Sequence, residues 1–304
     1  MTRKVVIDTD PGIDDAVAIL FALASPAFDV LGITTVAGNI GLSTVTRNAG
    51  RILTLAGRSD IPVIAGAAAP LSRKGFDTTE IHGDDGLGGV ALPEPDPAAP
   101  VGEGASRWIA ETLLRHPFGS VDVLALGPLT NLARLATEHP AAAGRIGRII
   151  AMGGAIDERG NIGPHSEFNL AADPEAADIV LRAGLPLVLV PLDVTRRVRA
   201  TRAYLDRLRT SARPSALASA DLIDAYFQST TGGTSRPLHD PCVMLYAEQP
   251  GLFGLDEMAL AVDLGDGVDA GALLRDQDGA QVKVAMRVDA QAALDLLELR
   301  LAKT

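Results

Sequence analysis

The sequence lacks several features that common classes of protein require. Among its 304 residues Cys242 is the single cysteine, so no disulfide can form within the chain and a reducing compartment is natural. Acidic residues outnumber basic ones by 38 to 27, and the formal net charge is −11. No basic stripe is present either, which argues against a nucleic acid as partner.

Long hydrophobic runs are also absent. Apolar segments such as residues 185–191 are far too short to cross a bilayer, so no membrane partner is expected. The chain enters a predicted strand within four residues of its first Met, which leaves no room for a signal peptide. These observations together predict a soluble, cytoplasmic protein.

The sequence does have strand and helix patterns in alternation. Strands are expected near residues 5–8, 30–36, 63–65, 121–126, 146–152, 187–191, 258–262 and 281–287. Helices are expected near residues 14–25, 43–57, 104–115, 129–138 and 174–183, between about 202 and 229, and up to 301. With no long linker, this predicts one α/β domain, residues 1–304, built on a mixed, mostly parallel, doubly wound (Rossmann-like) sheet with helices on both faces. Right-handed crossovers then place the carboxyl ends of the strands at one edge, where ligands bind.

The first predicted strand runs into a cluster of acidic residues. Asp8, Asp10, Asp14 and Asp15 fall within eight residues, between the strand and a helix that reads as buried. Carboxylates this close repel one another unless protons or a cation compensate, and oxygen-only ligands suit a hard ion such as Ca²⁺ or Mg²⁺. Helix capping explains one acid or two, but not Asp8 and Asp10 as well. The spacing is not that of an EF-hand, so the hypothesis is a metal or polyol site at the sheet edge.

Amides and acids follow other predicted strands as well. They are Asn39, Asn131, Asn161, Glu167, Asn169 and the pair His239 and Asp240, together with the turn that begins at Met152. Such groups at a concave edge suit a vicinal diol, whose hydroxyls donate to carboxylates and share bonds with amides. Taken singly, each also fits an ordinary role: the asparagines as turn or capping residues, the Gly-rich segments as loops, and His239 as a structural histidine.

The set and order of these motifs resemble those of the nucleoside hydrolases, the inosine-uridine-preferring family, over nearly the whole chain. The matching segments are DTDPGIDDA at 8–16, VAGN at 36–39, HGDDGLGG at 82–89, ALGPLTNLA at 125–133, MGG at 152–154, GN at 160–161, EFN at 167–169 and HDP at 239–241. The resemblance implies a single α/β domain, one tightly bound Ca²⁺ per subunit and a homodimer or homotetramer. It also implies that ribonucleosides are hydrolysed to free base and ribose, in nucleoside salvage or catabolism.

Carried over by position, the resemblance implies residue roles. The calcium ligands would be the carboxylates of Asp10, Asp15 and Asp240 and the backbone carbonyl of Leu126. The ribose hydroxyls would be held by Asp14, Asn39, Asn161, Glu167, Asn169 and Asp240. Met152 would border the sugar and Phe168 would pack against the pocket, while His82 and His239 would face the nucleobase.

The implied reaction breaks the C1′–N bond through an oxocarbenium-like transition state, which resembles that of glycoside hydrolysis. A calcium-bound water would attack C1′, and Asp10 would take its proton. Carboxylates near the ribose would favour the developing positive charge. The departing base would need help from His239, and from His82, because imidazole can change protonation near neutral pH.

The region that would contact the base departs from the family pattern. Members often place a Tyr with Arg or Gln about eight to twelve residues before the HDP motif, where this chain has Thr231 and Phe227. A shifted register or a nearby side chain could restore a polar contact through Tyr226, Gln228 or Arg236. The base preference therefore stays open.

Two further segments of the sequence have no firm assignment. Residues 230–235 are interpreted as a closing lid, and His165 precedes the EFN motif without a defined role. Two other functions also fit the observations. One is a calcium-dependent hydrolase of another N-riboside with an altered base pocket. The other is a ribose-binding protein without catalysis, which would need neither a metal nor Asp10 placed to activate water.

Overall fold

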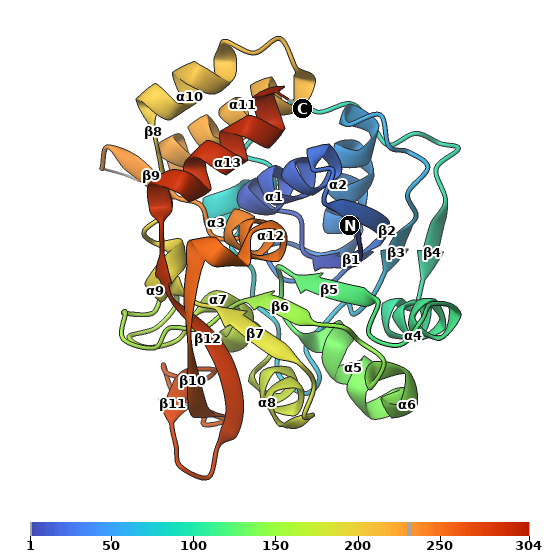
Figure 1. The fold of residues 1–304 in the computed structure, drawn as a ribbon, viewed down its shortest axis with the longest axis vertical. Helices are drawn as coiled ribbons and strands as arrows, with labels where there is room; N and C mark the ends of the chain where they lie inside the picture. Colours follow the sequence, from blue (N-terminus) through green and yellow to red (C-terminus); the bar gives the residue numbers. More distant parts are fainter. Residues whose placement is uncertain (1, 230–232, 304) are drawn as a thin grey trace.

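The computed structural model describes residues 2–229 and 233–303. Its main sheet has ten strands in the order β11-β10-β12-β7-β6-β5-β1-β2-β3-β4 (Figure 1). They are β1 (Arg3–Thr9), β2 (Phe28–Thr35), β3 (Val63–Ala65), β4 (Val101–Glu103), β5 (Val121–Ala125), β6 (Ile149–Met152), β7 (Leu187–Val190), β10 (Phe253–Val262), β11 (Leu273–Arg275) and β12 (Ala280–Val288). The pairings from β4 through β1 to β7 and β12 are parallel, whereas β10 is antiparallel to β12 and β11. The predicted mixed, mostly parallel sheet is confirmed.

Helices cover both faces of the sheet (Figure 1). On one side, α1 (Ile13–Ala24) packs against α11 (Pro214–Ser229), α12 (Pro241–Glu248) and α13 (Ala290–Lys303). The other side is covered by α4 (Ala105–Arg115), α5 (Thr130–Glu138), α6 (Pro140–Ala143) and α8 (Pro174–Arg182). The remaining helices are α2 (Leu42–Leu55), α3 (Thr79–His82), α7 (Phe168–Ala172), α9 (Leu192–Thr195), α10 (Arg202–Arg209) and the 3₁₀ turn η1 (Pro250–Leu252).

Strand β1 and helix α1 show why the sequence folds in this way. β1 lies between β2 and β5, so its residues Val5, Val6 and Ile7 are fully buried on both faces. Parallel strands of this kind read as continuous apolar runs. α1 is covered by the sheet on one side and by three helices on the other, so its apolar residues are buried all round. The short connection from Thr9 to Ile13 therefore lies at the carboxyl edge of the sheet.

The predicted elements and the observed ones differ mainly in short segments. No sequence pattern indicated the three-residue strands β4 and β11, or the small antiparallel pair β8 (Arg199–Thr201) and β9 (Ser235–Pro237). Such short pieces carry too few residues for a periodic pattern. Strand β10 also begins at Phe253 rather than near 258, because its first half alternates partly exposed residues and includes Asp256 and Glu257.

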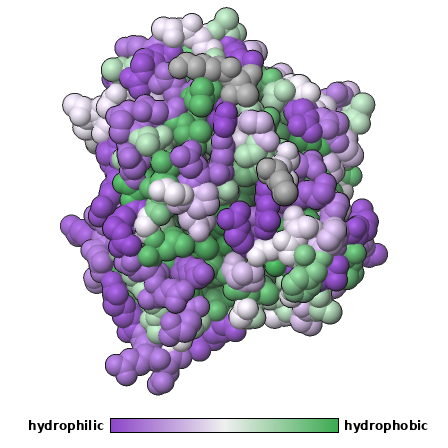
Figure 2. All heavy atoms as spheres, in the orientation of Figure 1, coloured by the Kyte–Doolittle hydropathy of each residue, from purple (hydrophilic) through white to green (hydrophobic). Residues whose placement is uncertain are grey.

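No helix in the described part of the chain is long and apolar enough to span a membrane. Figure 2 shows hydrophilic residues over much of the rim of one face, with hydrophobic residues visible between them toward the middle.

Candidate active site

The acidic residues of the first motif converge with Asp240 at the carboxyl edge of the sheet. Asp10 lies between β1 and α1, Asp14 and Asp15 lie in the first turn of α1, and Asp240 is the N-cap of α12. Carboxylate oxygens of Asp14, Asp15 and Asp240 all lie within 4.8 Å of one another. Asp10 and Asp15 are fully buried, and Asp14 and Asp240 are nearly so.

Hydrogen bonds hold these carboxylates in place unequally. Asp15 accepts from Thr9 Oγ1 at 2.6 Å, from the Gly12 N–H at 3.0 Å and from Asn39 Nδ2 at 3.1 Å. Because the bond from the Gly12 N–H caps the N-terminus of α1, helix capping accounts for part of the role of Asp15. Asp10 Oδ2 accepts from the Asn39 N–H at 2.7 Å, but Asp10 Oδ1 is buried with no partner among the described residues.

The electrostatics of the cluster favour a cation. Burial, and then the charges of neighbouring carboxylates, raise the pKa of Asp10 and of Asp240 well above the ordinary value, and burial together with Asp14 raises the pKa of Asp15 to about 6. The cluster would therefore hold protons unless a cation replaced them. The atoms that this cluster offers to a cation are all oxygens, and Asp10 Oδ1 lacks a hydrogen-bond partner within the described chain. These residues fit a hard cation such as Ca²⁺.

Close packing around Asp10 fixes its carboxylate. Gly38 and Gly127 lie so near it that a Cβ added at either position would collide with the Asp10 side chain. The backbone carbonyl of Leu126, the fourth predicted ligand, accepts from Asn169 Nδ2 at 2.6 Å, and a carbonyl oxygen has a second lone pair for another partner.

A pocket of about 500 Å³, including its open mouth, lies above the cluster. Its lining consists of Asp14, Asn39, Thr78, Ile81, His82, Leu126, Met152, Asn161, Glu167, Phe168, Asn169, Tyr226, His239 and Asp240. Every residue that the sequence predicted for ribose, base or sugar contact is in this set. Thr78 and Ile81 are additional, and among the open alternatives that fall within the described residues Tyr226 lines the pocket. Asp10 and Asp15 lie beneath it.

Glu167 and the two asparagines near it form one polar wall of the pocket. Glu167 is the N-cap of α7 and accepts the N–H groups of Asn169 and Gly154, each at 3.0 Å. Burial raises the Glu167 pKa to about 6. Asn161 Oδ1 accepts the Phe168 N–H at 2.9 Å, and Asn169 Nδ2 donates to Leu126 and Met152. These bonds fix the orientation of both amides within the pocket lining.

The two histidines of the pocket are held by different partners. His82 ends α3, and its Nδ1 accepts the Ile13 N–H at 3.1 Å, so in the neutral ring the proton lies on Nε2. His239 Nδ1 contacts Thr195 Oγ1 at 2.8 Å, and a hydroxyl can donate or accept. Burial lowers the pKa of both imidazoles. His82 thus belongs to α3, with the Gly-rich loop beginning after it, and its ring is held by a backbone N–H of α1.

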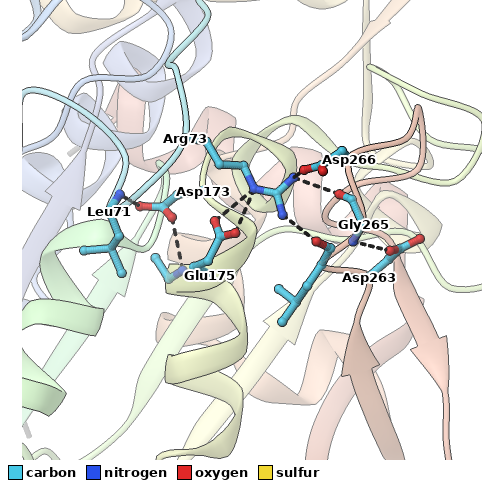
Figure 3. A network of polar contacts seen from close by, with 9 residues as sticks. Leu71, Arg73, Asp173, Glu175, Asp263, Gly265 and Asp266 are labelled. Carbon is cyan, nitrogen blue, oxygen red and sulfur yellow. Dashed lines mark hydrogen bonds and ion pairs between the residues drawn. The ribbon is translucent and has the colours of Figure 1, made fainter.

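The segment between β3 and α3 forms a further wall, and Figure 3 shows how it is fastened. Arg73 donates to Glu175 on α8 and to the backbone carbonyls of Leu264 and Gly265 (Figure 3). Beyond this anchor, Phe76 contacts Phe168 edge to face, with ring centroids 5.6 Å apart. The anchored segment therefore supports the aromatic residue that borders the pocket.

Several residues that the sequence suggested as candidates do not line the pocket. Asp8 Oδ1 accepts hydrogen bonds from Thr34 at 2.5 Å and from Asn131 at 2.8 Å. Asp8 and Asn131 therefore belong to the framework that supports the site. His165 is mostly exposed and contacts Asp269. Arg236 lies over the Phe227 ring and donates to backbone carbonyls at the end of α11. Gln228 is exposed, and Thr231, with the rest of the first half of the proposed lid, lies outside the described residues.

The carboxyl edge of the α/β sheet thus carries a cluster of buried carboxylates and a pocket lined by carboxylates, amides and histidines. The family model of the inosine-uridine preferring nucleoside hydrolases matches residues 5–295, and the chain belongs to that family. The protein is therefore an N-ribosyl hydrolase, as the sequence predicted.

Individual relatives agree with this assignment. The chain is 40% identical to the pyrimidine-specific ribonucleoside hydrolase RihA of Citrobacter koseri over 311 residues, which covers 99% of each chain. It superposes on a plant nucleoside hydrolase with a TM-score of 0.91 at 34% identity, over the whole of both chains. A purine-preferring ribonucleoside hydrolase from Gardnerella vaginalis gives a TM-score of 0.91 at 29% identity, covering 98% of both. One of these relatives is named for pyrimidine ribonucleosides and another for purine ribonucleosides.

Proposed function

We propose that this protein hydrolyses ribonucleosides to free base and ribose with a Ca²⁺ ion held by Asp10, Asp15, Asp240 and the Leu126 carbonyl. The observation that supports this most is the buried Oδ1 of Asp10, which has no partner among the described residues. When bound, Ca²⁺ would orient the attacking water and the ribose hydroxyls and lower the pKa of that water.

The residues of the chain would then carry out the proton transfers and the binding. Asp10 would accept a proton from the attacking water, because its Oδ2 is committed to the Asn39 N–H whereas Oδ1 has lone pairs for both the cation and the water. Asp14, Glu167 and the amides hold the ribose hydroxyls. Their negative charge also favours the oxocarbenium-like transition state as the C1′–N bond breaks.

On the opposite side of the sugar, the histidines assist the departing base. His82 can donate only through Nε2, because its Nδ1 accepts the Ile13 N–H. His239 is the candidate for proton donation to the base. Tyr226, with Phe168 and Ile81, borders this half of the pocket and would contribute to base recognition.

Pyrimidine ribonucleosides are the first substrates to test, because the curated relatives at 38–40% identity over nearly the full chain are named pyrimidine-specific. We further propose a cytoplasmic homodimer or homotetramer of single-domain subunits that acts in nucleoside salvage or catabolism.

A panel of ribonucleosides, read by production of reducing sugar with and without a calcium chelator, tests the proposal. Calcium-dependent release of base from uridine, cytidine or inosine is the expected result. Binding without release would indicate a ribose-binding protein, and release only from other N-ribosides would indicate the altered hydrolase. Full activity after removal of all bound metal would exclude the calcium mechanism.

A further inference from the structure

Helix α9 carries two polar side chains that are buried and outside the pocket lining. The helix follows β7 at the carboxyl edge of the sheet, and all four of its residues are buried. Asp193 is 3% exposed and Thr195 is fully buried. Buried polar groups need partners, and those of these two residues lie in different segments of the active site.

Asp193 holds the loop that leads to Asn161. Its carboxylate accepts three consecutive backbone N–H groups, from Ile156 at 2.9 Å, Asp157 at 2.8 Å and Glu158 at 3.2 Å. Arg196, directly after α9, continues the attachment by donating to the carbonyls of residues 159 and 160. The backbone of residues 156–160 is thus fixed to one turn of helix immediately before Asn161.

Thr195 holds the imidazole of His239. Its hydroxyl lies 2.8 Å from His239 Nδ1, and Thr195 is fully buried while His239 is partly buried. The contact occupies Nδ1 and leaves Nε2 as the ring nitrogen for a ligand in the pocket. Because a hydroxyl can donate or accept, the same contact orients the ring whichever nitrogen carries the proton.

We propose that α9 positions the two halves of the active site independently. Asp193 fixes Asn161 on the ribose side, and Thr195 fixes His239 on the side of the leaving base. Both act through another residue and so are positioning residues. This inference rests on the proposed function, and it adds two residues that belong to none of the sequence motifs.

The Thr195 half is tested with Thr195→Val, which removes the hydroxyl at nearly constant volume, and with Thr195→Ser, which keeps it. With uridine, kcat of the Val variant should fall about 10–100-fold, the range typical for loss of a partner that orients a functional group. With nitrophenyl riboside, whose leaving group needs no proton, kcat should change by less than about threefold. The Ser variant should restore turnover of uridine.

The Asp193 half is tested with Asp193→Asn and Asp193→Ala. Both should raise KM about 10-fold, and equally for uridine and nitrophenyl riboside, because the ribose contact is common to the two substrates. Asp157→Asn is the matched control. It lies in the same loop, but its side chain is exposed and pairs with Arg275 at the surface, so KM should stay unchanged.

Calcium content and thermal unfolding of each variant check that it is folded. Ring ¹⁵N shifts of His239 in the wild type give a reading that needs no variant, and they should show a hydrogen-bonded Nδ1. An unbonded Nδ1, equal losses on both substrates in Thr195→Val, or unchanged KM in the folded Asp193 variants would each overturn the inference. If the wild type released base from no nucleoside, the proposed function itself would fail, which is a separate outcome.

Discussion

Replacing Asp10 by asparagine tests the proposed chemistry with little change of shape. The carbonyl of the new side-chain amide can accept the Asn39 N–H as Asp10 Oδ2 does at 2.7 Å, and the amide nitrogen then takes the place of Oδ1. Since Oδ1 has no partner among the described residues, the substitution breaks no hydrogen bond to them. It removes one negative charge, one of the proposed calcium ligands and the only group in our proposal that can accept the proton from water, so calcium affinity must be measured beside turnover to separate the two losses.

The expected effect on catalysis is large and the effect on stability is small. Loss of a general base lowers kcat about 10²–10⁴-fold, which corresponds to about 2.7–5.4 kcal/mol at about 1.36 kcal/mol per factor of ten. Without calcium, the variant should unfold at a temperature no lower than the wild type, because burial and neighbouring carboxylates already disfavour the charge on Asp10. Uridine turnover, calcium affinity and thermal unfolding are measured on the same preparations.

Asp8→Asn is the matched control for this experiment. Asp8 is also fully buried, two residues away, with a pKa raised by burial to about 6 and one oxygen without a partner in the described chain. Its other oxygen accepts from Thr34 and Asn131, and an amide carbonyl can keep both bonds. We expect activity within about 10-fold of wild type for this change away from the reacting atoms. If Asp10→Asn were as active as Asp8→Asn, the assignment of Asp10 as base would be refuted.

Of four further predictions, two concern the metal, one the sugar and one the leaving group. Because three carboxylates and one carbonyl would supply the ligands, elemental analysis should find about one calcium per chain, and Asp15→Ala should remove it. Calcium affinity should weaken as pH falls through about 6, because calcium must displace the proton that the raised pKa of Asp15 retains; titrations showing no such dependence would contradict this. Deoxyribonucleosides should be poor substrates, since a missing hydroxyl leaves Asp14 and its neighbours unsatisfied at a cost of about 1–3 kcal/mol, and equal rates would remove the diol contact. His239→Ala should slow uridine far more than nitrophenyl riboside, whereas equal loss on both, together with loss of calcium, would assign His239 to structure alone.

The sequence predicted the sheet, and the gathering of acids and amides at one of its edges, because both depend on local pattern. Strand β1 is a continuous apolar run, and Asp10, Asp14 and Asp15 follow it within a few residues. The edge of the sheet then brings these acids to Asn39 and Asp240, as the topology requires. In this part of the molecule the order of elements along the chain is enough to place the side chains.

Other features depended on contacts between distant residues, which no local pattern reveals. The sequence placed Asp8 in the acidic cluster, but its carboxylate accepts hydrogen bonds from Thr34 and Asn131 on neighbouring elements. Tyr226 reaches the pocket because of the direction in which α11 ends, and counting back from His239 could not fix that register. Asp193 and Thr195 lie in a four-residue helix without a recognisable motif, and their roles follow only from what they touch.

The carboxylates of the site differ in how many hydrogen bonds they accept from the chain, and this difference supports different roles for Asp15 and Asp10. Asp15 receives three hydrogen bonds and caps α1, so its position is fixed by the structure and it is suited to holding a cation. Asp10 is equally buried, but one oxygen accepts the Asn39 N–H while the other contacts no donor in the described chain. A bare buried carboxylate oxygen is unfavourable for folding, and like charges around it add to the cost. A bound cation would offset that cost, and in our proposal a second lone pair of the same oxygen remains for the attacking water. The buried Asp10 oxygen that has no partner in the described chain is thus the atom that the proposal assigns to both the cation and the water.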